Sequence, residues 1–168
     1  DLYVLAPGPC ILLPYDPKRL DRFALNVFLL KPETASELER RGLLSRQNTK
    51  SMPLPDTCAS FDVSFADYPY GRFLIKPFPL HRSPNRYESG ILAFFLSKTA
   101  GDTFTRAGFL SESFSRLSAA TDESPTFPRL QSLARVAWEI GARSVAVHAL
   151  DRLLQRCSRG SFDDLGEP

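Results

Sequence analysis

Hydrophobic residues in the second half of the chain recur every three or four positions, the spacing of one face of an α-helix. Four such stripes predict four helices, over 83–99, 102–120, 130–140 and 144–155. Ser83 is a favoured residue for the N-cap of the first helix. The polar stretch 120–128 predicts a loop. Short links place each pair of helices antiparallel. We therefore expect a domain of two helical hairpins over 83–157 and a tail at 158–168.

The first half of the chain has a different pattern, because eleven of the fourteen prolines precede residue 85. Proline removes a backbone donor and interrupts helices, so residues 1–82 should form short elements. Two amphipathic stretches predict short helices at 16–30 and 32–44, the second ending near Gly42. Strict alternation within 61–65 predicts a strand that pairs with 71–78, giving a β-hairpin at 61–78. The expected fold is mainly α, with a small proline-rich α/β N-terminal portion.

Small residues mark the contact between the last two helices. Helices pack about 8 Å apart where small side chains meet and about 10 Å apart where large ones do. The alanines of this segment should line the close contact, while the leucines outside it require a further apolar surface. The residues expected to make this packing are Leu130, Leu133, Ala134, Ala137, Gly141, Ala146, Leu150 and Leu153.

The pattern at 130–153 resembles the tetratricopeptide repeat, a family of helical hairpins of about 34 residues. A shift of 39 residues gives a weaker copy over about 88–118. Two positions depart from the family pattern: no proline stands near Ser158, and Ala137 occupies a place where an aromatic is favoured. The resemblance implies stacked hairpins that act as a docking scaffold. The other interpretation of the same spacing is a generic helical hairpin in an ordinary bundle.

A basic stretch ahead of the first predicted helix is the best candidate for ligand chemistry. Arginines beside the free N–H groups of a helix start can hold a phosphate or carboxylate. The residues of this predicted anion site are Arg72, Lys76, Arg82, Ser83 and Arg86. The structural alternative is a solvated basic edge with a helix cap. His81 lies within the stretch, but no nucleophile stands in a recognisable position beside it.

The composition of the chain reduces the number of possible function classes. The net charge of +2 and the absence of an apolar run of about 18 residues argue against nucleic acid and membrane partners. No phosphate-cradling glycine motif is present, and we expect no catalytic residue, metal or cofactor. Three widely spaced cysteines suggest free thiols in a reducing, cytoplasmic compartment. The start without Met or a basic leader suggests a piece of a longer or processed protein.

Two main functions remain open at this stage, and a third option is a stand-alone enzyme that uses His81. The first is a non-enzymatic helical-repeat scaffold that binds a protein partner. The second is an accessory segment of a larger bacterial-type glycosyltransferase or methyltransferase, in which the basic stretch 72–86 contacts an anionic small molecule. A nucleotide- or S-adenosylmethionine-binding motif in the parent reading frame would favour the second.

Overall fold

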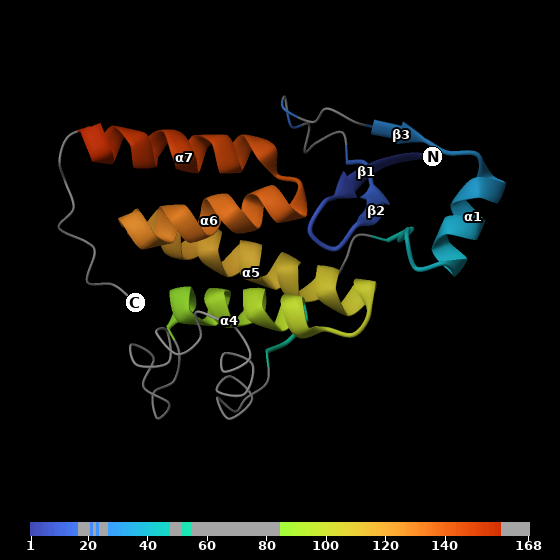
Figure 1. The fold of residues 1–168 in the computed structure, drawn as a ribbon, viewed down its shortest axis with the longest axis horizontal. Coiled ribbons are helices and arrows are strands. Elements are labelled where there is room, and N and C mark those ends of the chain that lie inside the picture. The colour runs from blue at the N-terminus through green and yellow to red at the C-terminus, as the bar shows by residue number, and fades with distance from the viewer. Residues whose placement is uncertain (17–20, 22, 24–26, 48–51, 55–84, 159–168) are drawn as a thin grey trace.

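The computed structural model describes residues 1–16, 21, 23, 27–47, 52–54 and 85–158. Within them the chain is mainly helical, with a three-stranded antiparallel sheet at the N-terminus. Helices α4, α5, α6 and α7 lie beside one another in chain order, and the sheet and α1 lie at one end of this helical layer (Figure 1). The predicted hairpin at 61–78 lies outside the described residues.

The sheet is built from apolar runs near the N-terminus that the sequence analysis did not identify as strands. Strand β1 (Leu2–Ala6) lies between β2 (Ile11–Pro14) and β3 (Val27–Leu29). Tyr3 pairs with Pro14 on one side and with Phe28 on the other. A short apolar run is compatible with either a strand or a buried helix. The Pro-Gly turn between the first two runs was the signal in the sequence that could have identified them as paired strands.

Strand β3 also corrects the helix expected over 16–30. The apolar residues of 16–30 do have helical spacing, but Val27–Leu29 forms a strand that pairs with β1. Apolar, β-branched and aromatic side chains suit a strand, and pairing with a distant segment overrides local helical spacing. The earlier part of the predicted helix falls largely outside the described residues.

Helix α1 (Pro32–Arg40) confirms the second short helix predicted from the sequence. Pro32 stands at its first turn, Glu33 is acidic near its start, and Arg40 is basic at its end, as the helix dipole favours. Gly42 follows with a positive φ of 70°. The helix packs beside the sheet, where Ala35 is buried together with Tyr3 and Leu44.

Helices α4 (Arg86–Thr99) and α5 (Thr103–Glu123) form the first hairpin. The N-cap of α4 is Asn85 rather than the predicted Ser83, because Asn85 and Glu88 form a reciprocal capping box. In it the Asn85 side chain accepts from Glu88 N at 2.9 Å, and the Glu88 carboxylate accepts from Asn85 N at 2.8 Å. Asp102 caps α5 by accepting from Thr105 N at 2.9 Å.

Helices α6 (Phe127–Ile140) and α7 (Arg143–Ser158) form the second hairpin. Gly141 ends α6 with a φ of 89°, a left-handed conformation that glycine adopts without steric cost. The expected loop over 120–128 is shorter than predicted, since α5 continues to Glu123 and α6 begins at Phe127. Thr121, although β-branched, is buried there and donates its hydroxyl to Leu117 O at 2.7 Å.

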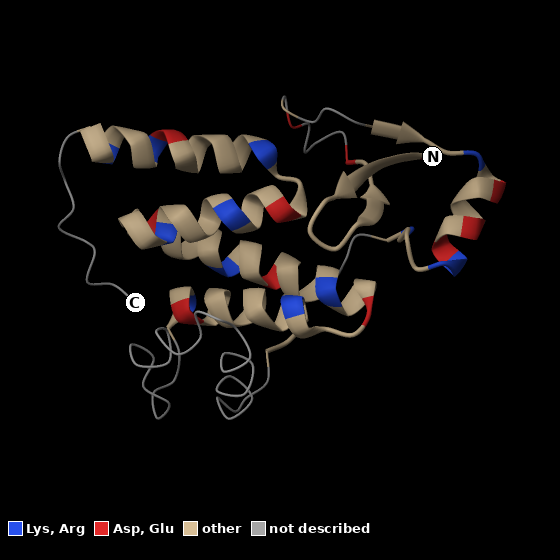
Figure 2. Cartoon of the chain, viewed as in Figure 1, with Lys and Arg blue, Asp and Glu red and all other residues tan. Residues whose placement is uncertain are grey.

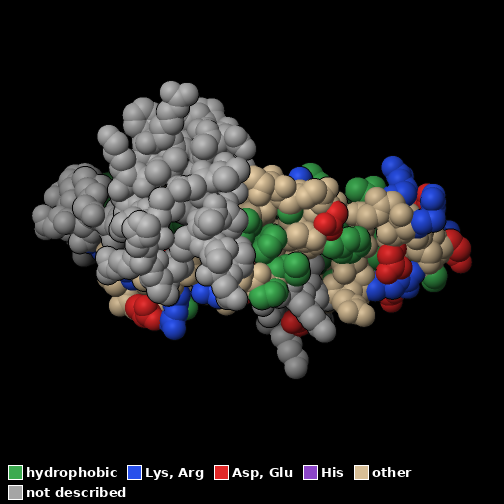
Figure 3. All heavy atoms as spheres, turned by 90° about the horizontal axis from the view of Figure 1, so that it is seen from below, with side chains coloured by type: hydrophobic (Ala, Val, Ile, Leu, Met, Phe, Trp, Pro, Cys, Tyr) green, Lys and Arg blue, Asp and Glu red, His purple; other side chains and the backbone are tan. Residues whose placement is uncertain are grey.

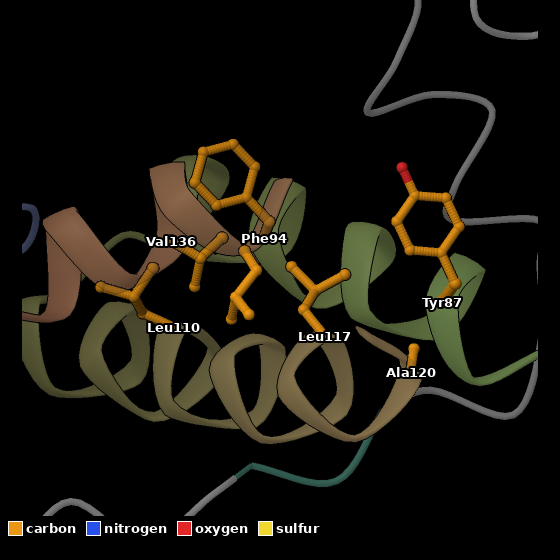
Figure 4. Packing of buried hydrophobic residues seen from close by; sticks show 7 residues of the cluster. Tyr87, Phe94, Leu110, Leu117, Ala120 and Val136 are labelled. Atoms are coloured by element: carbon orange, nitrogen blue, oxygen red, sulfur yellow. The ribbon is translucent and has the colours of Figure 1, made fainter. Parts of the chain in front are cut away.

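The main core lies where α4, α5 and α6 meet. Figure 4 shows the side chains of this cluster, contributed by all three helices. Its buried members are Tyr87, Phe94, Leu110, Leu117, Ala120, Leu133 and Val136. A smaller cluster joins the sheet to the helices, because Ala6 and Ile11 pack against Ala107 of α5. Gly8 N also donates to Glu139 O at 2.8 Å, which fixes the β1–β2 turn against the end of α6.

Candidate functional site

The predicted anion site is represented in the described residues by Arg86 alone. Arg86, the first residue of α4, forms an ion pair with Glu123, the last residue of α5, at the open end of the first hairpin. The guanidinium therefore already has a carboxylate partner, and this contact supports a structural role for Arg86. The other four residues predicted for this site, Arg72, Lys76, Arg82 and Ser83, lie outside the described residues.

The residues expected to pack the last hairpin occupy two different environments. Those buried in the structure are Leu130, Leu133, Ala134, Ala137, Ala146 and Leu153. Leu130 and Ala134 of α6 meet Ala149 and Leu153 of α7, so the small side chains lie at the contact between the two helices. Leu150 is different, because 49% of its surface is exposed.

Leu150 belongs to an apolar stripe on α7 that no element of the described part of the chain covers. Val147 is 40% exposed and Leu154 is 69% exposed. Positions 147, 150 and 154 follow the three- and four-residue spacing that places side chains on one helix face. By contrast Ala146, Ala149 and Leu153 turn toward α6.

Trp138 of α6 extends this stripe onto the neighbouring helix. It is 55% exposed, and the guanidinium of Arg143 lies 5.4 Å from the centre of its ring. Arg143 stands one helical turn before Val147, so Trp138 is close to the start of the stripe. We call the four residues Trp138, Val147, Leu150 and Leu154 the apolar face.

The N-terminus of α7 is held in place by a residue from the N-terminal portion. The carboxylate of Asp21 accepts a hydrogen bond from Ser144 N at 2.7 Å and another from the Ser144 hydroxyl. Phe23 N donates to the same carboxylate at 2.8 Å. A carboxylate placed there satisfies a free N–H group and favours the positive end of the helix dipole. The contact fixes the first turn of α7, from which the apolar face begins.

The protonation of Asp21 follows from this position. Burial raises the pKa of its carboxyl group, but the hydrogen bonds from Ser144 and from the backbone of Phe23 and Arg143 outweigh that effect. The pKa therefore lies below its ordinary value of 3.8. Asp21 is ionised at neutral pH, as the capping role requires.

The hairpin that carries the apolar face has a net positive charge. Residues 127–158 contain five arginines and two carboxylates, a net charge of +3. The whole chain has a net charge of +2, so the remaining residues together carry −1. Figure 2 marks Lys and Arg positions in blue on both α6 and α7. One of the two carboxylates, Glu139, is already paired with Lys98 of α4.

Side chains suited to metal or nucleophilic chemistry do not gather elsewhere in the described part of the chain. Among those residues no three His, Cys, Asp or Glu side chains form a group that could hold a metal ion. Cys10 and Cys157 are exposed free thiols. None of the described helices combines the length and apolar character that crossing a bilayer requires. Hydrophobic side chains also reach the surface on the side where α4 lies (Figure 3).

The sequence analysis did not identify two residues of the apolar face, and it assigned a third one, Leu150, to the packing of the last hairpin. Val147 and Trp138 were not identified, although the spacing of 147, 150 and 154 was available as a signal. Spacing alone does not say which of two adjacent stripes on a helix meets its neighbour. The exposed Leu150 and the buried Leu153 could be distinguished only from the packing.

Comparison with known proteins adds no further constraint. No family model, curated protein or solved structure matches the chain.

Proposed function

We propose that this chain is a helical scaffold that binds a protein partner through the apolar face of its last hairpin. In this proposal α4–α5 and α6–α7 are two stacked units of the tetratricopeptide-repeat type, and α7 is the outermost helix of the stack. The observation that carries the proposal is the exposure of Trp138, Val147, Leu150 and Leu154 together on one face.

Hydrophobic burial explains why this face should take a partner. Burial of a leucine or valine side chain contributes about 1.5–3 kcal/mol relative to full exposure. The three partly exposed side chains of α7, together with Trp138, could therefore contribute substantially to the free energy of binding a partner. Scattered apolar residues are common on protein surfaces, but a contiguous patch marks an interaction site. Aromatic residues such as tryptophan are enriched among the residues that dominate binding energy.

The scaffold interpretation also accounts for the close contacts within the layer. Ser113 donates its hydroxyl to Gly90 O at 2.8 Å across the first hairpin, and alanines line the second. Two rigid hairpins would present the apolar face with little loss of conformational freedom on binding. The alternative role in an anion-dependent transferase receives no comparable support, because Arg86 is already paired with Glu123.

Photo-crosslinking tests the proposal. A photoreactive phenylalanine analogue at position 150 should form an adduct with one protein, which mass spectrometry identifies and which is then purified. The same analogue at Phe104, which is 42% exposed on α5, provides the matched control. The purified partner should bind the chain at least about tenfold more weakly after Leu154→Ser and normally after Phe104→Ser.

Stability measurements complete this test. Leu154 is 69% exposed, so Leu154→Ser should change the unfolding free energy by less than about 0.5 kcal/mol. The proposal fails if positions 150 and 104 give the same adducts, or if Leu154→Ser leaves binding to the purified partner unchanged.

A further inference from the structure

We infer that the partner element which covers the apolar face is an acidic amphipathic helix. This inference rests on the proposed function and specifies the chemistry of its ligand. It is based on three observations: the spacing of the exposed side chains, the positive charge of the hairpin that carries them, and the completed backbone hydrogen bonding of a helical surface.

The shape of the face suits a helix. Val147, Leu150 and Leu154 span eight residues of α7, and the seven steps between the first and the last rise about 10 Å at 1.5 Å per residue. Backbone groups in the middle of a helix are already hydrogen-bonded, so the face offers no free strand edge to an extended peptide. Recognition must therefore use side chains, and an amphipathic helix with apolar residues at i, i+3, i+4 and i+7 supplies the complementary stripe.

The charge of the hairpin determines the sign of the partner. Residues 127–158 have a net charge of +3, and Arg143 lies beside both Trp138 and the stripe. Arg135 is 71% exposed and adds to the charge of the hairpin, but its guanidinium lies 5.4 Å from the Phe94 ring, on the side of α6 that faces α4. Arg143 is therefore the arginine placed at the apolar face. Opposite charges across an interface speed association and exclude like-charged partners, so glutamate and aspartate should border the apolar stripe of the ligand.

The same charge argues against a second copy of this chain as the occupant. Symmetric docking through the apolar face would bring two hairpins of net charge +3 together. Like charges placed opposite each other in an interface are destabilising. An acidic helix removes this repulsion and buries the same apolar side chains.

The fluorescence of Trp138 allows a direct test, because it is the single tryptophan of the chain. The full chain is titrated with a tryptophan-free amphipathic peptide of about 18 residues, long enough to form a helix. The peptide has leucine on one face and glutamate elsewhere. A matched peptide has lysine in place of every glutamate. Binding should shift the Trp138 emission to the blue and saturate, with the glutamate peptide at least about tenfold tighter at low salt.

Charge reversal tests the role of Arg143. The variant Arg143→Glu should lose most of the preference for the glutamate peptide, because Arg143 lies beside Trp138. The control Arg41→Glu makes the same change in net charge directly after α1, away from the apolar face (Figure 1), and should keep that preference. Leu150→Ser should abolish the emission shift with either peptide, and circular dichroism should show all variants folded.

Three results would overturn the inference. The first is that the lysine peptide binds as tightly as the glutamate peptide. The second is that neither peptide shifts the Trp138 emission. The third is that the emission shifts with protein concentration in the absence of peptide, which would indicate that a second copy of the chain covers the face. Photo-crosslinking at position 150 separates this failure from that of the proposed function. An identified partner without peptide binding contradicts only the acidic helix, whereas loss of both results contradicts the docking face itself.

Discussion

The smallest residues of the chain decide how closely its helices approach. Gly90 of α4 faces α5, and a Cβ atom added there would lie 2.8 Å from both Cγ and Cδ2 of Leu117. Leu117 has no exposed surface and belongs to the main core, so it has little room to move. Ser113 also donates to Gly90 O at 2.8 Å. A single missing methyl group thus sets the distance between the helices of the first hairpin.

We expect Gly90→Ala to destabilise the protein by about 1–3 kcal/mol, because overpacking of a close contact outweighs the roughly 1 kcal/mol gain in helix propensity. Urea unfolding followed by circular dichroism measures the change. Gly101→Ala is the matched control, since a Cβ atom there would meet nothing within 4 Å. Equal stability of the two variants would show that α4 and α5 are not closely packed at Gly90.

Among the secondary-structure elements, the ends of helices depend on partners of two kinds. Asn85 and Asp102 cap α4 and α5 from the position directly before each helix, within reach of local sequence reasoning. The first turn of α7 instead uses Asp21, which precedes Ser144 by 123 residues. No local pattern could identify this contact, because it exists only after the N-terminal portion has packed against the second hairpin.

Replacing Asp21 tests this distant cap. Asp21→Asn removes the charge and one acceptor, so it should cost about 1 kcal/mol at neutral pH. The pKa of Asp21 is lowered in the folded state, which means that the unfolded state binds more protons at acid pH. Its contribution to stability is therefore complete well above pH 3.8 and disappears as the pH falls through the lowered folded-state pKa.

Urea unfolding at pH 7 and at pH 3 measures this dependence. The difference between the wild-type chain and Asp21→Asn should be smaller at pH 3. Asp122→Asn, an exposed position on α5, should change stability at pH 7 by less than about 0.5 kcal/mol. A difference for Asp21→Asn that is equal at both pH values would contradict the cap.

In the molecule as a whole, Glu139 lies where three parts of the chain meet. Its carboxylate pairs with Lys98 of α4, its backbone carbonyl accepts from Gly8 N of the β1–β2 turn, and it stands in the last turn of α6. The side chains of Lys98 and Glu139 are 29% and 16% exposed. This pair, partly shielded from water, joins α4 to α6, and the backbone bond from Gly8 holds the β1–β2 turn against the same residue.

Glu139→Gln should destabilise the protein by about 1–3 kcal/mol, between the values for exposed and fully buried ion pairs, because Lys98 would keep a poorly hydrated charge. Glu37→Gln removes the carboxylate of an exposed pair with Arg40, whose side chains are 51% and 73% exposed, and should cost less than about 0.5 kcal/mol. Thermal unfolding of both variants provides the comparison. A larger loss for Glu37→Gln would refute the role of Glu139 as a junction.

The sequence by itself determined the helices of the second half, the end of α1 near Gly42 and the hairpin turn at Gly141. Each of these depends on residues within a few positions of one another, so spacing and capping chemistry suffice. Only the tertiary structure decided that Val27–Leu29 is a strand, that Arg86 meets Glu123, and that Leu153 is buried while Leu150 and Leu154 face solvent. These features depend on contacts between distant segments, and two stripes on one helix have the same period whichever of them is covered.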